Sequence, residues 1–273
     1  MRTSKIRAKL SRGETAICVT LHLTDPSIYE MTSLLGFDGI WMDLEHHGYS
    51  VEVAGQLMRA ARVGSADIVA RPAKGEFMRM SRLLEMGAQA IMYPRCDGPE
   101  EAAQVVRWSK FAPLGTRGFD GGNADAAYTG VPMTEYLAQA NRETLVIIQL
   151  EHQQAVDQAE AIAALPGVDL IMLGPADFSI LEGFPGQFDD PRIRRAMETI
   201  ACAARNTGKH WACTAMTLEN ARQAIELGCG LVFHDSDLRM IKCSMERMQA
   251  QFAELGFQFE SRLGVVANVA NPP

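Results

Sequence analysis

The sequence lacks the patterns that mark several large classes of protein. Its six cysteines are scattered, mostly inside apolar stretches, and they form no CxxC pair or other zinc-ligand spacing. We therefore expect reduced thiols in the core. The formal net charge of −7 does not supply the clustered Lys and Arg that a nucleic-acid surface needs. Small-molecule chemistry is the function class that these absences favour.

Long hydrophobic runs and secretion signals are also missing. No window approaches the roughly 18 apolar residues of a membrane-spanning helix. The first ten residues carry positive charge without an apolar segment or a cleavage site. We expect a soluble, cytoplasmic protein that has neither a membrane nor a nucleic acid as partner. At 273 residues and 47% hydrophobic content, the chain can bury a full core.

Short apolar runs alternate with longer amphipathic stretches, which is typical of α/β proteins. Strands are expected near residues 16–22, 39–43, 67–71, 90–94, 145–151, 169–173, 210–213 and 230–233. Helices are expected between them, among others at 50–63, 99–110, 152–164, 191–207 and 217–227. Eight such units predict a (β/α)8 TIM barrel. A doubly wound open sheet is the competitor, but the first strand-to-helix junction lacks a GxGxxG or GxxxxGK[ST] phosphate loop.

Two segments interrupt this alternation within what we expect to be a single domain over residues 1–273. Residues 111–142 form a long Gly-rich insertion, which we interpret as an active-site loop. Residues 237–257 have the pattern of a long helix, so that 237–273 forms a C-terminal helix and tail. The tail from residue 263 onward is apolar, and this surplus indicates a partner subunit.

Several of the expected strands end abruptly in ionisable residues, and in a barrel the carboxyl ends of the strands form the mouth of the active site. Glu151 and Asp177 follow the fifth and sixth strands. Two converging carboxylates repel each other unless a cation or a proton lies between them, and oxygen ligands suit Mg²⁺ or Mn²⁺. We predict a divalent metal here. The alternative is that each carboxylate caps a helix or pairs with a surface arginine.

His46 and Arg71 follow the second and third strands. With an ordinary pKa of about 6.5, a histidine at the mouth opposite a metal pair is the natural general base. The alternative is a satisfied polar residue, which is our interpretation of His47. Arg71 is suited to hold a substrate carboxylate or a developing oxyanion, and a salt bridge to Asp43 or Glu45 is the alternative.

Three further features bear on the same mouth. Gln149 shares a strand face with Glu151 and should point into the site. The run from Gly174 to Ala176 would present backbone N–H groups to an anion at the start of the next helix. Lys74 is the one lysine near a strand carboxyl end, and an isolated loop lysine is usually solvated, which disfavours a Schiff-base mechanism.

A set of spaced motifs lies within about residues 15–250: Asp43-Leu-Glu-His46, Arg71-Pro72, Leu83-Leu84-Glu85-Met-Gly87, Gly115-Thr-Arg117-Gly118, Gln149-Leu-Glu151 and Gly174-Pro-Ala-Asp177-Phe-Ser179. Taken together, these motifs resemble those of the HpcH/HpaI aldolase family. This family comprises class II metal-dependent pyruvate aldolases, such as 4-hydroxy-2-oxoheptanedioate aldolase and 2-keto-3-deoxy-sugar-acid aldolases. The resemblance implies reversible cleavage of a 4-hydroxy-2-keto acid to pyruvate and an aldehyde. It also implies Mg²⁺ or Mn²⁺ as cofactor, with Co²⁺ as a further candidate, and a homohexamer.

The resemblance assigns a role to each matched residue. Arg71 would stabilise the enolate, His46 would be the base, and Glu85 would be the acidic partner of that histidine. The implied sets are the catalytic residues His46, Arg71 and Glu85, the substrate-binding residues Arg71, Gln149, Gly174, Ala176 and Asp177, and the metal ligands Glu151 and Asp177.

Some residues at the mouth depart from the family pattern, namely His22, Arg95, His234 with Asp235, and residues 119–128. Arg95 would favour an acceptor that carries its own carboxylate, or it packs against its neighbours. Two alternative functions stay open. One is oxaloacetate decarboxylation, or another pyruvate-enolate lyase reaction on the same site. The other is a non-catalytic barrel that only binds a keto acid.

Overall fold

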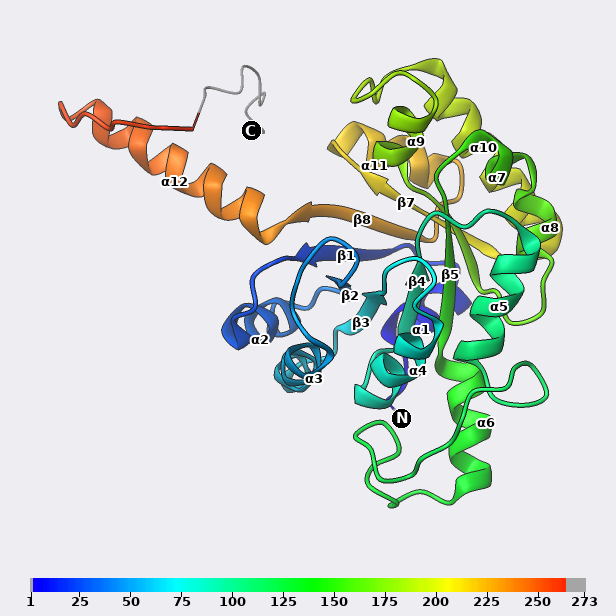
Figure 1. Cartoon of the computed structure of the whole chain (residues 1–273). Helices are drawn as coiled ribbons and strands as arrows, with labels where there is room; N and C mark the ends of the chain where they lie inside the picture. Colours follow the sequence, from blue (N-terminus) through cyan, green and yellow to red (C-terminus); the bar gives the residue numbers. More distant parts are fainter. Residues whose placement is uncertain (1, 264–273) are drawn as a thin grey trace. The chain divides into compact units, whose positions relative to one another are not determined.

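The computed structural model describes residues 2–263, and its centre is a closed barrel of eight parallel strands in sequential order (Figure 1). Strand β8 returns to pair with β1, with Ala16 opposite Leu231, so the sheet has no free edge. The strands are β1 Ala16–Leu21, β2 Gly39–Asp43, β3 Asp67–Arg71, β4 Ala90–Tyr93, β5 Leu145–Leu150, β6 Leu170–Leu173, β7 His210–Ala215 and β8 Leu231–Ser236. The TIM barrel expected from the sequence is confirmed, and the open sheet is excluded.

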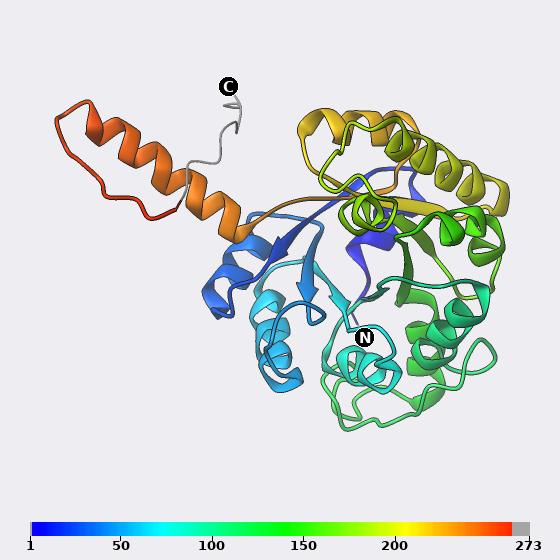
Figure 2. The same ribbon diagram turned by 45° about the horizontal axis from the view of Figure 1, so that its top comes forward.

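The helices between consecutive strands ring the barrel (Figure 2). In chain order, the helices of the described residues are α1 Lys5–Ser11, α2 Pro26–Leu34, α3 Val51–Ala60 with the 3₁₀ turn η1 Ala61–Val63, α4 Phe77–Met86, α5 Pro99–Ser109, α6 Met133–Glu143, α7 Gln153–Asp157, α8 Ala159–Ala163, α9 Pro175–Leu181, α10 Pro191–Thr207, α11 Leu218–Glu226 and α12 Asp237–Ala253. Local chemistry sets their ends. The Ser50 side chain accepts from the backbone N–H of Val53 at the start of α3. Gly87 and Gly208 end α4 and α10 in the left-handed conformation that glycine adopts without strain.

Three expectations about the helices are wrong in detail. The last part of the 111–142 segment is α6, which packs Tyr136 and Ala140 against Phe111, so the irregular insertion ends near residue 132. The helix expected over 152–164 is two short helices, α7 and α8, divided at Gln158. Helix α1 has no counterpart among the expected elements, because seven residues are too few to show a clear apolar period.

Helix α1 closes the end of the barrel at which the strands begin. Its buried side chains Ile6 and Leu10 belong to the same apolar cluster as the residues that fill the barrel interior. The fit is tight, since a Cβ placed on Gly39 would lie 2.5 Å from the Cys18 sulfur and 2.9 Å from Ile6 Cδ1. With this end filled by apolar side chains, polar chemistry belongs to the opposite end, where the strands finish.

The chain divides into two compact units, residues 1–237 and residues 238–273. The first is the barrel, and the second contains the rest of α12, which carries apolar side chains such as Leu238, Met245, Met248 and Phe252. Most of the expected apolar tail, from residue 264 onward, lies outside the described residues. Within the described residues, no helix is both long enough and apolar enough to cross a membrane.

Candidate active site

A cavity of about 210 Å³ lies at the carboxyl ends of the strands. Its walls come from the ends of β2, β3, β5, β6 and β7 and from the first turn of α9. The lining residues are Trp41, His46, Arg71, Gln149, Glu151, Gly174, Pro175, Ala176, Asp177, Thr214 and Met216. The structure therefore brings together all the site residues expected from the sequence except Glu85.

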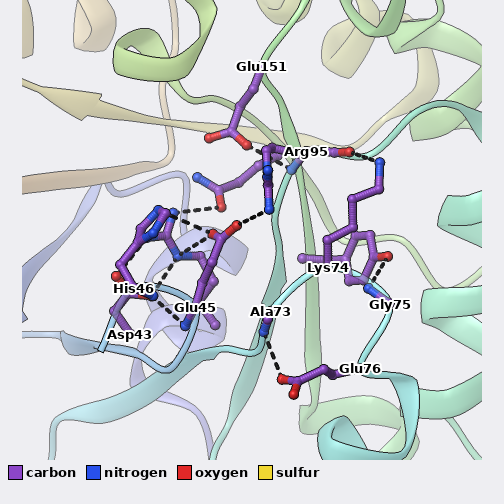
Figure 3. A network of polar contacts seen from close by, with 12 residues as sticks. Asp43, Glu45, His46, Ala73, Lys74, Gly75, Glu76, Arg95 and Glu151 are labelled. Atoms are coloured by element: carbon purple, nitrogen blue, oxygen red, sulfur yellow. Dashed lines mark hydrogen bonds and ion pairs between the residues drawn. The ribbon is translucent and has the colours of Figure 1, made fainter. Parts of the chain in front are cut away.

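Glu151 is a buried carboxylate directly after β5, with 2% of its surface exposed. Its Oε2 accepts the backbone N–H of Arg95 at 2.7 Å (Figure 3). Burial raises the pKa of Glu151 to about 7, and the charge of Asp177 acts in the same direction, although the Arg95 N–H opposes it. Oε1 lies against Gly174, where a Cβ would approach it to 2.2 Å. Only glycine leaves room for this carboxylate.

Asp177 lies in the first turn of α9, which begins with Pro175 immediately after β6. Proline suits this position because its fixed φ matches the helix and the missing N–H would have no partner there. Ala176 and Asp177 follow it, in the turn whose N–H groups have no intrahelical acceptor. The cavity thus combines backbone donors of a first helical turn with two carboxylates, one directly after β5 and one in α9.

The donor set fits a hard divalent cation. Glu151 and Asp177 both present carboxylate oxygens to the cavity, and the raised pKa of Glu151 reflects a buried carboxyl beside another negative charge. In the described part of the chain, no group of three or more His, Cys, Asp or Glu side chains is arranged to hold a metal ion. Two carboxylates, with the remaining ligands from substrate and water, are typical of Mg²⁺ sites.

Arg71 is held from several sides at the end of β3. Its Nε and Nη2 donate to the two Asp43 oxygens at 3.0 and 2.7 Å, and its guanidinium lies 4.5 Å above the Trp41 ring. Nη1 donates to Gln149 Oε1 at 3.4 Å, on the cavity side. Burial alone would raise the pKa of Asp43, but the bonds from Arg71 outweigh it and hold this pKa below its ordinary value. The salt bridge considered from the sequence is present, and it aims the guanidinium at the cavity.

His46 projects from the loop that follows β2, and 56% of its side chain is exposed. This loop is built on Asp43, whose Oδ1 accepts the backbone N–H of Glu45 at 3.0 Å and that of His46 at 3.4 Å. The imidazole Nε2 lies 3.7 Å from Glu45 Oε2. An accessible imidazole beside a carboxylate can exchange protons with a ligand in the cavity.

The expected pairing of Glu85 with His46 is not found within the described chain. Glu85 lies in the last turn of α4, a helix that carries the chain from the mouth back to the start of β4. Burial raises its pKa, while its charged neighbours include Arg117, Asp120 and Asp125. The carboxylate beside His46 is instead that of Glu45.

Three residues line the cavity without having been expected there, and His22, which was expected at the mouth, does not line it. Trp41, Thr214 and Met216 line the cavity but were not expected there. The expected seventh strand stopped at residue 213, but β7 extends to Ala215. With the correct strand end, the rule that strand carboxyl ends line the mouth would have included Thr214. His22 instead lies against the ring of His47, with 4.5 Å between the ring centroids, and neither residue lines this cavity.

The sequence was also compared with known families and proteins. The model of the HpcH/HpaI aldolase/citrate lyase family matches residues 17–240. The chain belongs to this family. It is 30% identical over 250 residues to the hydroxypyruvate/pyruvate aldolase of Pseudomonas aeruginosa, covering 91% of this chain and 92% of that protein. It is also 30% identical over 249 residues to the 5-keto-4-deoxy-D-glucarate aldolase of Klebsiella pneumoniae, covering 91% and 96%.

A solved structure agrees with this assignment. The crystal structure of the HpcH/HpaI aldolase from Desulfitobacterium hafniense superposes with a TM-score of 0.87 at 26% identity, covering 93% of this chain and 98% of that one. The resemblance noted in the sequence is therefore confirmed. Membership of the HpcH/HpaI family makes the protein a carbon–carbon lyase of the aldolase type.

Proposed function

We propose that the protein catalyses the reversible aldol cleavage of a 4-hydroxy-2-keto acid to pyruvate and an aldehyde, with Mg²⁺ or Mn²⁺ at Glu151 and Asp177. One observation carries the proposal: a carboxylate pair, Arg71 and His46 meet in a single cavity at the strand ends. The relatives named above, which include a hydroxypyruvate/pyruvate aldolase, support a keto acid as the substrate.

The chain's own groups would hold such a keto acid in a defined orientation. The backbone N–H groups of Ala176 and Asp177 are donors for its carboxylate, because the first turn of a helix leaves them unpaired. Nη1 of Arg71 faces the cavity beside Gln149 and would donate to the keto oxygen. The ring of Trp41 and the side chain of Met216 complete the walls around this end of the substrate.

Arg71 would stabilise the negative charge that develops on the keto oxygen as the carbon–carbon bond breaks. A divalent cation, when bound, adds Lewis-acid polarisation of the same oxygen. Two bonds to Asp43 fix the guanidinium before substrate arrives, so little reorganisation accompanies the reaction. Cleavage leaves the enolate of pyruvate in the site, and its methylene carbon takes up a proton from water, while the proton that the base removed from the 4-hydroxyl group returns to solvent.

His46 would accept the proton of the 4-hydroxyl group during cleavage and return it during condensation. Its exposed ring reaches the open side of the cavity, from which the aldehyde enters and leaves. Glu45, 3.7 Å from Nε2, would stabilise the imidazolium that forms. Proton transfer then needs no group beyond the loop that follows β2.

Product formation from pyruvate and a panel of small aldehydes tests this proposal. With Mn²⁺ present we expect an aldol adduct, and with a chelator we expect none. Activity that survives the chelator and is trapped by borohydride would replace the metal mechanism with a Schiff base. Decarboxylation of oxaloacetate without adduct from any aldehyde would support the decarboxylase alternative. Binding of pyruvate and Mn²⁺ without any turnover would support the non-catalytic one.

We further propose a homo-oligomer, a hexamer according to the family resemblance, and a cytoplasmic location. The measurement for the first is the molar mass in solution by light scattering. Co²⁺ remains a third candidate for the metal, and the same adduct assay compares it with Mg²⁺ and Mn²⁺.

A further inference from the structure

Arg95 links two of the carboxylates at the mouth of the barrel. It follows Pro94 after β4 and adopts a φ of 46°, a left-handed conformation that is uncommon for a residue with a long side chain. Its backbone N–H donates to Glu151 Oε2 at 2.7 Å. Its guanidinium Nη2 lies 2.9 Å from Glu45 Oε1 (Figure 3). One residue thus reaches the carboxylate after β5 with its backbone and the carboxylate after β2 with its side chain.

Glu45 divides its two oxygens between different partners. Oε1 faces Arg95, while Oε2 lies 3.3 Å from Arg71 Nε and 3.7 Å from His46 Nε2. The Glu45 side chain is 4% exposed, and a carboxylate buried to this extent is costly unless cations compensate it. Arg95 therefore supplies positive charge to Glu45, and Glu45 in turn lies beside both Arg71, the oxyanion donor, and His46, the base.

The balance of charge shows what Arg95 adds. Without it, the carboxylates of Asp43, Glu45 and Glu151 would share the charge of Arg71. Glu45 would then turn fully toward Arg71 and compete with the substrate for that guanidinium. The ion pair with Arg95 restrains Glu45, and the Arg71 Nη1 stays directed at the cavity beside Gln149.

We propose that Arg95 is a positioning residue of the aldolase site, which orients Glu151 through its backbone N–H and restrains Glu45 through its guanidinium. This inference rests on the proposed function, because it concerns the groups that act in that reaction. Of the two sequence-level interpretations of Arg95, it follows the one in which this residue packs against its neighbours rather than the one in which it recognises an acceptor carboxylate. The guanidinium is already paired with a carboxylate of the protein.

The left-handed backbone allows the two contacts to be separated. Asparagine tolerates a positive φ, so Arg95→Asn keeps the N–H in place for Glu151 and removes the guanidinium from Glu45. Arg95→Lys retains a cation on a flexible side chain. Arg79→Asn is the matched control, because it removes an ion pair to Glu76 on the surface of α4.

The test is a double-mutant cycle with Arg95→Asn, Glu45→Gln and the combined variant. For each variant, steady-state kinetics give kcat and the KM for both substrates, and calorimetry without substrate gives the Mn²⁺ affinity. We expect Arg95→Asn to lower kcat about 10-fold, as for other residues that orient metal and catalytic groups. Its Mn²⁺ affinity should stay within about twofold of wild type, because the N–H contact to Glu151 remains. Arg95→Lys should recover most of the activity, and Arg79→Asn should match wild type. In the Glu45→Gln background, Arg95→Asn should have little further effect on kcat.

Three results would overturn the inference. The first is a kcat for Arg95→Asn equal to that of wild type. The second is an equal loss of kcat from Arg95→Asn in the wild-type and Glu45→Gln backgrounds, which would mean that Arg95 acts independently of Glu45. The third is a loss confined to KM for the aldehyde, which would restore a role in substrate recognition. Wild-type enzyme that forms no adduct in this assay would instead contradict the proposed function, so the two failures are distinguishable.

Discussion

Replacing Arg71 with lysine is expected to lower kcat/KM for retro-aldol cleavage by about 10²–10³-fold, the usual cost of removing one preorganised oxyanion donor. Arginine donates through Nε and Nη2 to Asp43 while Nη1 remains at the cavity. A lysine ammonium is a single point charge on a flexible stem, so it cannot pair bidentately with Asp43 and also reach the keto oxygen. Steady-state kinetics with a 4-hydroxy-2-keto acid measure the loss.

Lysine is the informative substitution at this position. Alanine would leave the buried Asp43 without its main partner, and breaking a buried pair costs about 3–5 kcal/mol of stability. The lysine variant keeps a cation beside Asp43, and its melting temperature should confirm that it folds. Arg79→Lys, on the surface of α4, is the control for replacing an arginine with a lysine outside the cavity. A kcat/KM for Arg71→Lys within about threefold of wild type would exclude the oxyanion role.

Lowering the pH from about 7 to about 5 is expected to weaken Mn²⁺ binding roughly 100-fold, because each unit below the ligand's pKa costs about tenfold. The pKa of Glu151 is raised to about 7 by burial and by Asp177, so metal and proton compete for this carboxylate across that range. Above about pH 7 the affinity should level off. Calorimetric titration at several pH values, in buffers of different ionisation enthalpy, reports both the affinity and the released proton.

Glu151→Gln is the matched variant, because it keeps the shape of the side chain and cannot ionise. It should lose Mn²⁺ binding and the pH dependence together.

The thermal stability of the metal-free protein tests the raised pKa of Glu151 independently of metal binding. A carboxyl whose pKa is raised by folding penalises the metal-free fold as pH climbs from its ordinary value of 4.5 to about 7. Metal-free Glu151→Gln should therefore unfold at a higher temperature than wild type at pH 8. An Mn²⁺ affinity independent of pH between about 5 and 7 would contradict Glu151 as a ligand.

The barrel and most of the cavity residues could be predicted because both follow from local pattern. Buried parallel strands are apolar throughout, so the change to ionisable residues at Arg71, Glu151 and the run before Asp177 marks the mouth directly. Parallel pairing then brings consecutive strand ends to the same edge of the barrel. The number and spacing of the strand–helix units then predict a closed barrel of eight strands.

The surroundings of Glu85 and Arg95 depend on the direction of the chain or of a side chain, which local sequence pattern does not report. Glu85 precedes the glycine that ends α4, and in a barrel this end of a helix lies toward the start of the next strand, away from the mouth. Arg95 lies at the mouth as expected, but its φ of 46° turns the side chain toward Glu45, and no sequence pattern reports that angle. Pairing between two loops is set by tertiary geometry rather than by local sequence.

The central claim is that this site forms the enolate of pyruvate with the help of a divalent cation held by Glu151 and Asp177. Deuterium exchange at the methyl group of pyruvate in D₂O, followed by proton NMR with diamagnetic Mg²⁺, tests it without knowledge of the aldehyde. We expect the methyl signal to decay with wild-type enzyme and Mg²⁺, and to persist after chelation or with Glu151→Gln. Exchange that continues at the same rate in the presence of chelator, or no exchange with Mg²⁺ or any other divalent metal, would contradict the account.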